Sequence, residues 1–115
     1  MGTINVNVAK DFSRTPGSRY IKEGDFSGES FIKDFFESIF DEAIASNNSI
    51  TINLDGTLGY GTSFLEEVFG GLTRKYGKDL VVKTLNFISN EEPYLIDDIM
   101  EYIDEAEEQT RGKKK

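Results

Sequence analysis

The segment Ile50–Leu72 constrains the fold of this chain more than any other part of its sequence. Its first five residues alternate apolar and polar side chains, which predicts a buried central strand. Three glycines follow within six residues, and a helical pattern then runs from about 62 to 76. We therefore predict a strand, a glycine-rich turn and a helix whose first turn presents backbone N–H groups and two hydroxyls, Thr62 and Ser63, to an anion or a partner.

The remaining sequence predicts strands that alternate with helices. Strands are expected at 4–8, 50–54 and 85–88, with a short further strand at 19–21, and helices at about 29–45, 62–76 and 94–109, with a short helical turn at 79–83. This order predicts an α/β fold with a mixed or parallel sheet. We expect one domain at 1–110, followed by a frayed basic tail at 111–115.

Three local signals refine this prediction. Residues 11–28 form a long connector with a turn at Pro16-Gly17, and Ser27 is placed to cap the following helix. Asn47-Asn48 is expected to end that helix. Gly70-Gly71 lies inside the second long helix, where each glycine costs about 1 kcal/mol relative to alanine. Close packing or a bend is therefore expected there.

Composition excludes several function classes. The 115 residues have a net charge of −8 and contain neither His nor Cys. Without histidine, the chain lacks the commonest general base and zinc ligand. Without cysteine, it can neither form disulfides nor use a thiol in catalysis. Its negative charge also makes it poorly suited to contact a nucleic-acid backbone. No apolar run approaches the roughly 20 residues of a membrane helix. We expect a cytoplasmic, non-enzymatic protein without a metal or a cofactor.

Three blocks, Phe12–Arg19, Gly24–Glu29 and Leu54–Leu72, resemble the STAS-like domain family of unknown function. The resemblance extends over about residues 4–106. The family is related to bacterial anti-sigma-factor antagonists and to the STAS domains of anion transporters. It implies a mixed central sheet of about four strands, flanked by three or four helices.

The same resemblance implies a place for a regulatory site. In the antagonists an Asp-Ser-Ser-Gly sequence corresponds to residues 61–64, and a partner kinase phosphorylates its first serine. Thr62 takes that position here, whereas Gly61 replaces the aspartate and Phe64 replaces the glycine. The resemblance therefore implies a binding surface, with a kinase-like ATPase as one kind of partner, more than it implies phosphorylation.

The residues assigned to partner binding or regulation are Asp55, Gly59, Tyr60, Gly61, Thr62, Ser63 and Glu66. The hydroxyl pair allows two interpretations. It either caps the helix, with Ser63 and Glu66 as a capping box, or forms a recognition site. Asp55 is expected to accept hydrogen bonds from the N–H groups of its own turn. The glycines of the turn do not match a nucleotide-binding motif and are expected to supply positive φ angles.

Charged residues outside the turn suggest two further surfaces. Arg14, Arg19 and Lys22 belong either to a solvated loop or to a segment that folds over the turn and binds an anion or a partner carboxylate. Nine acids lie between residues 91 and 108 without one Lys or Arg, which indicates a solvated face or a docking strip. The acidic surface considered comprises Asp34, Glu37, Asp41, Asp97, Asp98, Glu101, Asp104, Glu105 and Glu108.

Two hypotheses about function follow. The first is a non-enzymatic STAS-like interaction module that regulates a partner protein in a bacterium or a phage. The second is an acidic inhibitor, of the anti-defence kind that phages encode, which mimics nucleic acid towards a DNA- or RNA-binding protein. Salt discriminates between them, because binding by charge mimicry weakens steeply as ionic strength rises.

Overall fold

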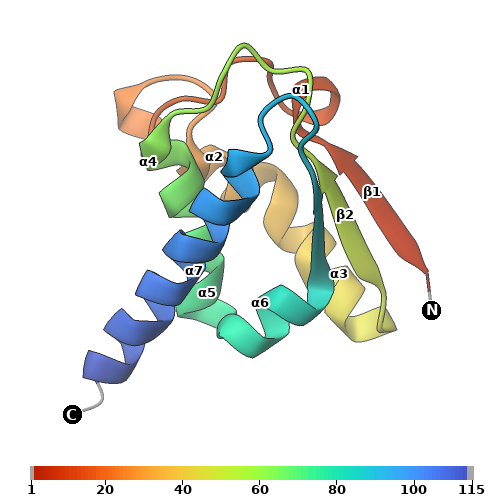
Figure 1. Ribbon diagram of the computed structural model, residues 1–115, viewed down its shortest axis with the longest axis vertical. Helices are drawn as coiled ribbons and strands as arrows, with labels where there is room; N and C mark the ends of the chain where they lie inside the picture. Colours follow the sequence, from red (N-terminus) through yellow and green to blue (C-terminus); the bar gives the residue numbers. More distant parts are fainter. Residues whose placement is uncertain (1, 114–115) are drawn as a thin grey trace.

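Figure 1 shows the computed structural model, which describes residues 2–113. Its sheet has three strands, β1 (Thr3–Asn7), β2 (Ser49–Asn53) and β3 (Leu85–Ile88), in the order β1-β2-β3. Both neighbouring pairs are parallel. For the part of the chain described, the sheet is parallel, which is one of the two arrangements that the order of elements predicted. The mixed sheet of about four strands that the family resemblance implied is wrong, whereas the α/β class is confirmed.

The missing strand is the one predicted at 19–21. Carbonyl oxygens of Ser18 and Arg19 accept hydrogen bonds of 2.8 and 2.9 Å from the first two N–H groups of helix α2 (Gly28–Phe31). The hydroxyl oxygen of Ser27 accepts the third at 3.0 Å, as its sequence position predicts. The carbonyl groups of this segment therefore accept hydrogen bonds from the first N–H groups of a helix and not from a neighbouring strand. The short 3₁₀ helix η1 (Ile21–Glu23) follows the segment.

Two of the three long helices predicted from the sequence, those at about 29–45 and 62–76, each contain a π-helical segment. The first comprises α2, η2 (Ile32–Phe36) and α3 (Glu37–Ser46), and the second comprises α4 (Thr62–Leu65), η3 (Glu66–Gly70) and α5 (Gly71–Tyr76). Asn47 ends α3 with a φ of 56°. The predicted helical turn at 79–83 is helix α6 (Lys78–Thr84).

The remaining helices are α1 and α7. Helix α1 (Val8–Asp11) continues directly from β1. Helix α7 (Tyr94–Lys113) extends beyond its predicted end near residue 109. The predicted frayed tail is therefore helical at 111–113, and the remainder of that prediction lies outside the described residues.

The long helices, α6 and α7 lie on one side of the sheet, and the other face is open (Figure 1). The covered face is apolar, and five phenylalanines are fully buried against it. The open face carries Thr3, Asn5, Asn7, Ser49, Thr51, Asn53, Asn86 and Ile88, none of them buried. Polar side chains keep this face compatible with water, although parallel sheets are usually covered on both faces.

The carboxyl ends of the three strands lie together at the top of Figure 1. The α1–α2 connector, the glycine-rich turn and the β3–α7 loop all leave the sheet there. This arrangement places the connector and the turn side by side, although about 40 residues of sequence separate them.

Candidate interaction surface at the glycine-rich turn

The glycine-rich turn, residues 54–61, leaves β2 and leads into α4. Gly56 and Gly59 have φ angles of 95° and 138°, which confirms the predicted need for positive φ at these two positions. The phenol of Tyr60 donates a hydrogen bond of 2.8 Å to the carbonyl oxygen of Leu54. Burial raises the pKa of Tyr60 well above its ordinary value, so the phenol stays protonated and holds the turn closed.

Gly61 has a different reason to be glycine, because the connector lies directly on it. Its N–H donates a hydrogen bond of 3.1 Å to the carbonyl oxygen of Pro16. A β-carbon at position 61 would lie 3.0 Å from the carbonyl carbon of Gly17 and would overlap the oxygen of that carbonyl. An aspartate, the residue of the antagonist motif, therefore cannot occupy position 61 while the connector is in place.

Asp55 fastens the turn to the β3–α7 loop. Its carboxylate accepts a hydrogen bond of 2.9 Å from the N–H of Glu91, and the Glu91 carboxylate accepts one of 2.8 Å from the N–H of Gly56. The sequence predicted bonds from Asp55 to its own turn, and the structure places the bond across to the next loop. Asp55 thus acts as a structural tie between two loops at the end of the sheet.

Thr62 and Ser63 are both exposed and are the first two residues of α4. Gly61 is the N-cap residue, and no side chain caps the helix. The predicted capping box of Ser63 and Glu66 is therefore wrong. Among the described residues, the N–H groups of Thr62, Ser63 and Phe64 donate to no protein atom, since the first backbone bond runs from Leu65 to Gly61. The hydroxyls and N–H groups of this helix start remain available to a partner.

Glu66 is held away from the helix start by two arginines. Its carboxylate is bonded to Arg19 of the connector and, at 2.8 Å, to Arg74 of α5. Burial opposes ionisation of Glu66, but the hydrogen bonds from Arg74 and Arg19 outweigh it and lower the pKa of this carboxyl. Gly70 makes this arrangement possible, because a β-carbon there would meet the Glu66 carboxylate.

Of the three connector cations, only Arg19 forms ion pairs within residues 2–113. It reaches Glu66 and, at 3.4 Å, Glu67. Arg14 contributes its backbone, because its carbonyl oxygen accepts a bond of 2.8 Å from the N–H of Leu58, while its side chain is exposed. Lys22 is also exposed. The connector thus folds over the turn mainly through its backbone and through Arg19.

Tyr102 of α7 lies beside Thr62, and acids of the same helix lie near this tyrosine. Burial raises the pKa of Tyr102, the charges of Asp98 and Glu101 raise it further, and the hydroxyl of Thr62 opposes them. Thr62 therefore lies against a tyrosine that carboxylates surround. Leu58 projects from the tip of the turn and is 74% exposed. We define the turn surface as Leu58, Thr62, Ser63, Asp98 and Tyr102.

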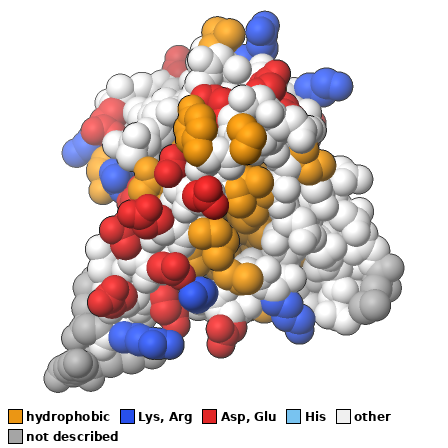
Figure 2. All heavy atoms as spheres, viewed as in Figure 1, with side chains coloured by type: hydrophobic (Ala, Val, Ile, Leu, Met, Phe, Trp, Pro, Cys, Tyr) orange, Lys and Arg blue, Asp and Glu red, His pale blue; other side chains and the backbone are white. Residues whose placement is uncertain are grey.

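The acids of the alternative surface fall into two groups. On the first long helix, Asp34 accepts a bond of 3.1 Å from Ser30, Glu37 pairs with Lys75 at 2.7 Å, and Asp41 accepts a bond of 2.5 Å from the phenol of Tyr76. On α7, Asp104 pairs with Lys78 at 2.7 Å. Asp97, Asp98, Glu101, Glu105 and Glu108 form no ion pair within the described chain. Figure 2 shows acidic side chains gathered over the lower left of this face, with Lys or Arg side chains among them.

Sequence reasoning missed five residues that shape this end of the molecule: Gly17, Leu58, Arg74, Glu91 and Tyr102. Gly17 and Gly61 lie in two of the sequence blocks that carry the family resemblance, which was the available signal for their contact. Leu58 also lies in one of these blocks, and Glu91 belongs to the acids of residues 91–108, but the sequence assigned neither of them to this site. Arg74 and Tyr102 carried no sequence signal that distinguished them from ordinary surface residues.

Residues 2–113 lack two features that would suggest a metal-binding or a membrane protein. No group of three or more acidic side chains lies close enough together there to hold a metal ion. None of the helices in this range combines the length and the apolar character that crossing a bilayer requires.

The fold and the site define a small α/β domain with one parallel sheet, one open sheet face and a polar candidate surface at the carboxyl end of the strands. The chain belongs to the family described as a STAS-like domain of unknown function (DUF4325), whose family model matches residues 27–95. The match contains β2, β3 and the helices between them, and β1 lies before it. Neither a curated protein nor a solved structure matches the chain.

Proposed function

We propose that this chain is a non-enzymatic regulatory module that binds a partner protein through the turn surface. The observation that carries the proposal is the uncapped start of α4. Thr62 and Ser63 are exposed there, and neither hydroxyl serves as a helix cap. Earlier in the same turn, Leu58 offers an apolar side chain that is 74% exposed. Hydroxyls, backbone donors and one apolar anchor are the elements of a polar protein interface.

A binding role fits the chemistry of the surface better than an enzymatic one. The chain has no His and no Cys. The carboxylate of Asp55 accepts a backbone N–H, and that of Glu66 is paired with two arginines. Neither acid is therefore available for proton transfer, which requires a positioned group with a suitable pKa. The absence of cysteine suits the cytoplasm that we propose as its location.

A kinase-like ATPase is the class of partner that the family resemblance suggests. We propose that binding itself occludes the partner, because the aspartate of the phosphorylated antagonist motif is replaced by Gly61 and cannot fit there. Asp98 and Glu101 lie near Tyr102, which Thr62 contacts, so they would repel a phosphate on Thr62. The same two acids favour a partner that brings a Lys or an Arg to this side of the turn surface.

Affinity purification from the native cell, with matched variants, tests the proposal. Ser63→Glu adds a charge at the turn surface, and Ser38→Glu adds the same charge at an exposed serine of α3. We expect the wild-type protein and the Ser38→Glu variant to retain one partner in a fixed ratio, and the Ser63→Glu variant to lose it. Equal retention by both variants would exclude the turn surface as the binding site.

One observation favours the alternative function, an inhibitor that mimics nucleic acid. Asp97, Glu101, Asp104, Glu105 and Glu108 are all exposed on α7 and recur at intervals of three or four residues, so they share one helix face. The first and last lie about 16 Å apart along the helix axis, from a rise of about 1.5 Å per residue. The acids on the first long helix, in contrast, are partly neutralised by α5. If the chain is such an inhibitor, its affinity for a basic partner should fall steeply as the salt concentration rises.

A further inference from the structure

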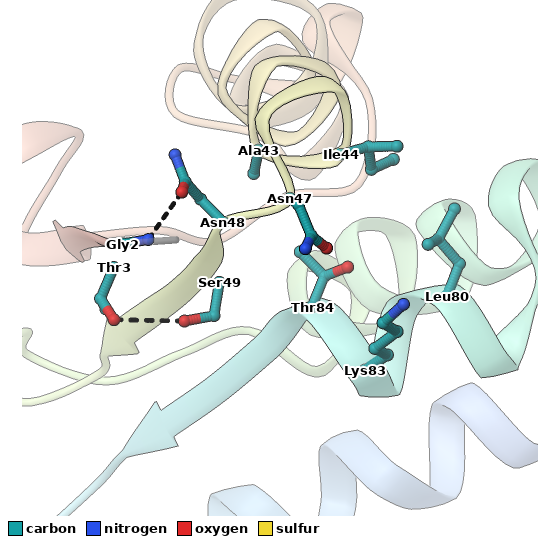
Figure 3. Close-up of a pocket in the computed structure, with 10 residues that line it drawn as sticks. All are labelled: Gly2, Thr3, Ala43, Ile44, Asn47, Asn48, Ser49, Leu80, Lys83 and Thr84. Carbon is teal, nitrogen blue, oxygen red and sulfur yellow. Dashed lines mark hydrogen bonds between the residues drawn. The ribbon is translucent and has the colours of Figure 1, made fainter.

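A second candidate site lies at the opposite end of the sheet from the turn surface. It is a pocket of about 460 Å³ at the amino ends of β1 and β2. The last turn of α3 and the following Asn47, the starts of the two strands, and α6 surround it (Figure 3). Ala43, Ile44 and Leu80 give it an apolar side, and its other lining residues are mostly polar.

The charge of this pocket differs from that of the molecule as a whole. The chain contains 21 acidic residues, yet none of them lines the pocket, and Lys83 does. Lys33, Lys75 and Lys78 each pair with a carboxylate, whereas Lys83 has no ion pair within residues 2–113. An unneutralised ammonium in a pocket without acids creates a local preference for a negative group.

Thr84 supplies a second, independent observation. Thr84 is only 5% exposed, and its hydroxyl makes no hydrogen bond to the described part of the chain. The hydroxyls of Thr73 and Thr110, in contrast, donate to the carbonyl oxygen four residues earlier, at 2.8 and 3.0 Å. Within residues 2–113, Ser18 has the only fully buried side-chain oxygen or nitrogen without a partner, so the hydroxyl of Thr84 is open to the pocket. The hydroxyl of Thr84 therefore has its hydrogen-bonding capacity left for something in the pocket.

The side-chain amide of Asn47 is the third polar group. The left-handed backbone of Asn47, with a φ of 56°, ends α3 and turns this residue to the pocket. Figure 3 shows the ammonium of Lys83 and the amide of Asn47 on the same side of the pocket as the hydroxyl of Thr84, with no hydrogen bond drawn among them. All three groups can donate a hydrogen bond.

The ends of α3 and α6 weaken this preference, although neither adds an acidic side chain to the pocket. Two of the last four carbonyl oxygens of α3 are occupied, because those of Ala43 and Ile44 accept the N–H groups of Asn48 and Asn47 at 2.8 and 3.2 Å. At the end of α6, the carbonyl oxygen of Val81 accepts the N–H of Leu85. The partial negative charge of the two helix ends still disfavours a doubly charged ligand. One lysine beside two helix ends suits a single negative charge.

We propose that this pocket binds a small organic monocarboxylate. The carboxylate accepts hydrogen bonds from Lys83, Thr84 and Asn47, and a short hydrocarbon chain lies against Ala43, Ile44 and Leu80. This assignment is independent of the turn surface and of the partner proposed for it.

Butyrate tests the proposal, with neutral butyramide and inorganic phosphate as comparison ligands. Two-dimensional amide NMR spectra of the full chain would be recorded as each compound is added. We expect butyrate to shift the signals of residues 47–49 and 83–84 in a saturable manner, at least about tenfold more tightly than butyramide, because hydrogen bonds to charged groups are the stronger kind. Phosphate is expected to bind more weakly than butyrate.

Three variants locate the site. Lys83→Met and Thr84→Val should each weaken butyrate binding, the first by at least about tenfold. Lys10→Met, at an exposed lysine of α1 on the far end of the sheet, should leave it unchanged. The amide spectra also report whether each variant is folded. Absence of saturable shifts at these residues, equal binding of butyramide, or undiminished binding by folded Lys83→Met would overturn the assignment.

Discussion

The carbonyl of Gly17 lies where the side chain of any other residue at position 61 would have to begin. The main chains of the connector and the turn pack directly against each other there. The N–H of Gly61 donates a hydrogen bond of 3.1 Å to the carbonyl oxygen of Pro16 and holds them together. The connector is therefore packed against the glycine-rich turn and restricts which residues fit in it. This contact also explains why the chain lacks the aspartate of the antagonist motif, since a longer residue would force the two segments apart.

Gly61→Ala is expected to destabilise the fold by about 1–3 kcal/mol, the usual cost of overpacking a tight contact. Gly71→Ala is the matched control, because a β-carbon there would meet Ile32 at 3.4 Å and Arg74 at 4.0 Å, both ordinary contact distances. Alanine should stabilise that helix by up to about 1 kcal/mol. Chemical denaturation measures both changes. Equal stability of the two variants would contradict the packing described for Gly61.

The reciprocal bonds between the turn and the β3–α7 loop predict a non-additive pair. Asp55→Asn and Glu91→Gln should each lower the free energy of unfolding by about 1 kcal/mol. The double variant should lose less than the sum, because either single change already loosens the same two loops. Asp25→Asn, at an exposed connector residue, is the control. Strict additivity in a double-mutant cycle would argue against a shared tie.

The ion pairs of Glu66 predict a defined dependence of stability on pH. Because the pKa of Glu66 is lowered in the folded state, its contribution is fully present above the unfolded value of about 4.3 and is lost as the pH falls through the folded value. The wild type should therefore exceed Glu66→Gln by about 1 kcal/mol at neutral pH, with a difference that shrinks in acid. Glu42→Gln, at an exposed position, should show no such trend. A difference that persists unchanged at low pH would contradict the pairing.

The unpaired hydroxyl of Thr84 predicts an asymmetry between two buried threonines. Thr84→Val removes a hydroxyl without a protein partner among residues 2–113, so its stability should stay within about 0.5 kcal/mol of the wild type or rise. Thr73→Val removes the hydroxyl bonded to Phe69 at 2.8 Å and should cost about 1 kcal/mol. Thermal unfolding of the two variants checks the order. A larger loss for Thr84→Val would show that its hydroxyl is already satisfied by the protein.

Sequence periodicity was sufficient to predict the strands and the long helices. Local patterns carry that information, as at Ser27, Asn47 and Gly56, where a cap or a φ angle depends on one residue. The contacts that shape the site join residues far apart in the chain. Arg19 reaches Glu66 and Asp55 reaches Glu91, and no local pattern specifies such pairs. The same limit explains the wrong strand at 19–21, whose backbone is used by a helix that begins later.

The capping prediction failed for a related reason. Ser63 and Glu66 have the spacing of a capping box, and by local rules alone they would form one. Arg19 and Arg74 both bind the Glu66 carboxylate, which is then not available to accept a hydrogen bond from the N–H at the helix start. A tertiary ion pair thus overrides a local motif and leaves the start of α4 uncapped.

Site-specific photo-cross-linking tests the central claim, that the turn surface binds a partner protein, most directly. A photoreactive phenylalanine analogue would be placed at Leu58, which is 74% exposed at the tip of the turn, and separately at Asn86 on the open sheet face. We predict that irradiation in the native cell joins the protein with the analogue at 58 to one partner of defined mass. The protein with the analogue at 86 should give no such product. The same product from position 86 and none from position 58 would contradict the account.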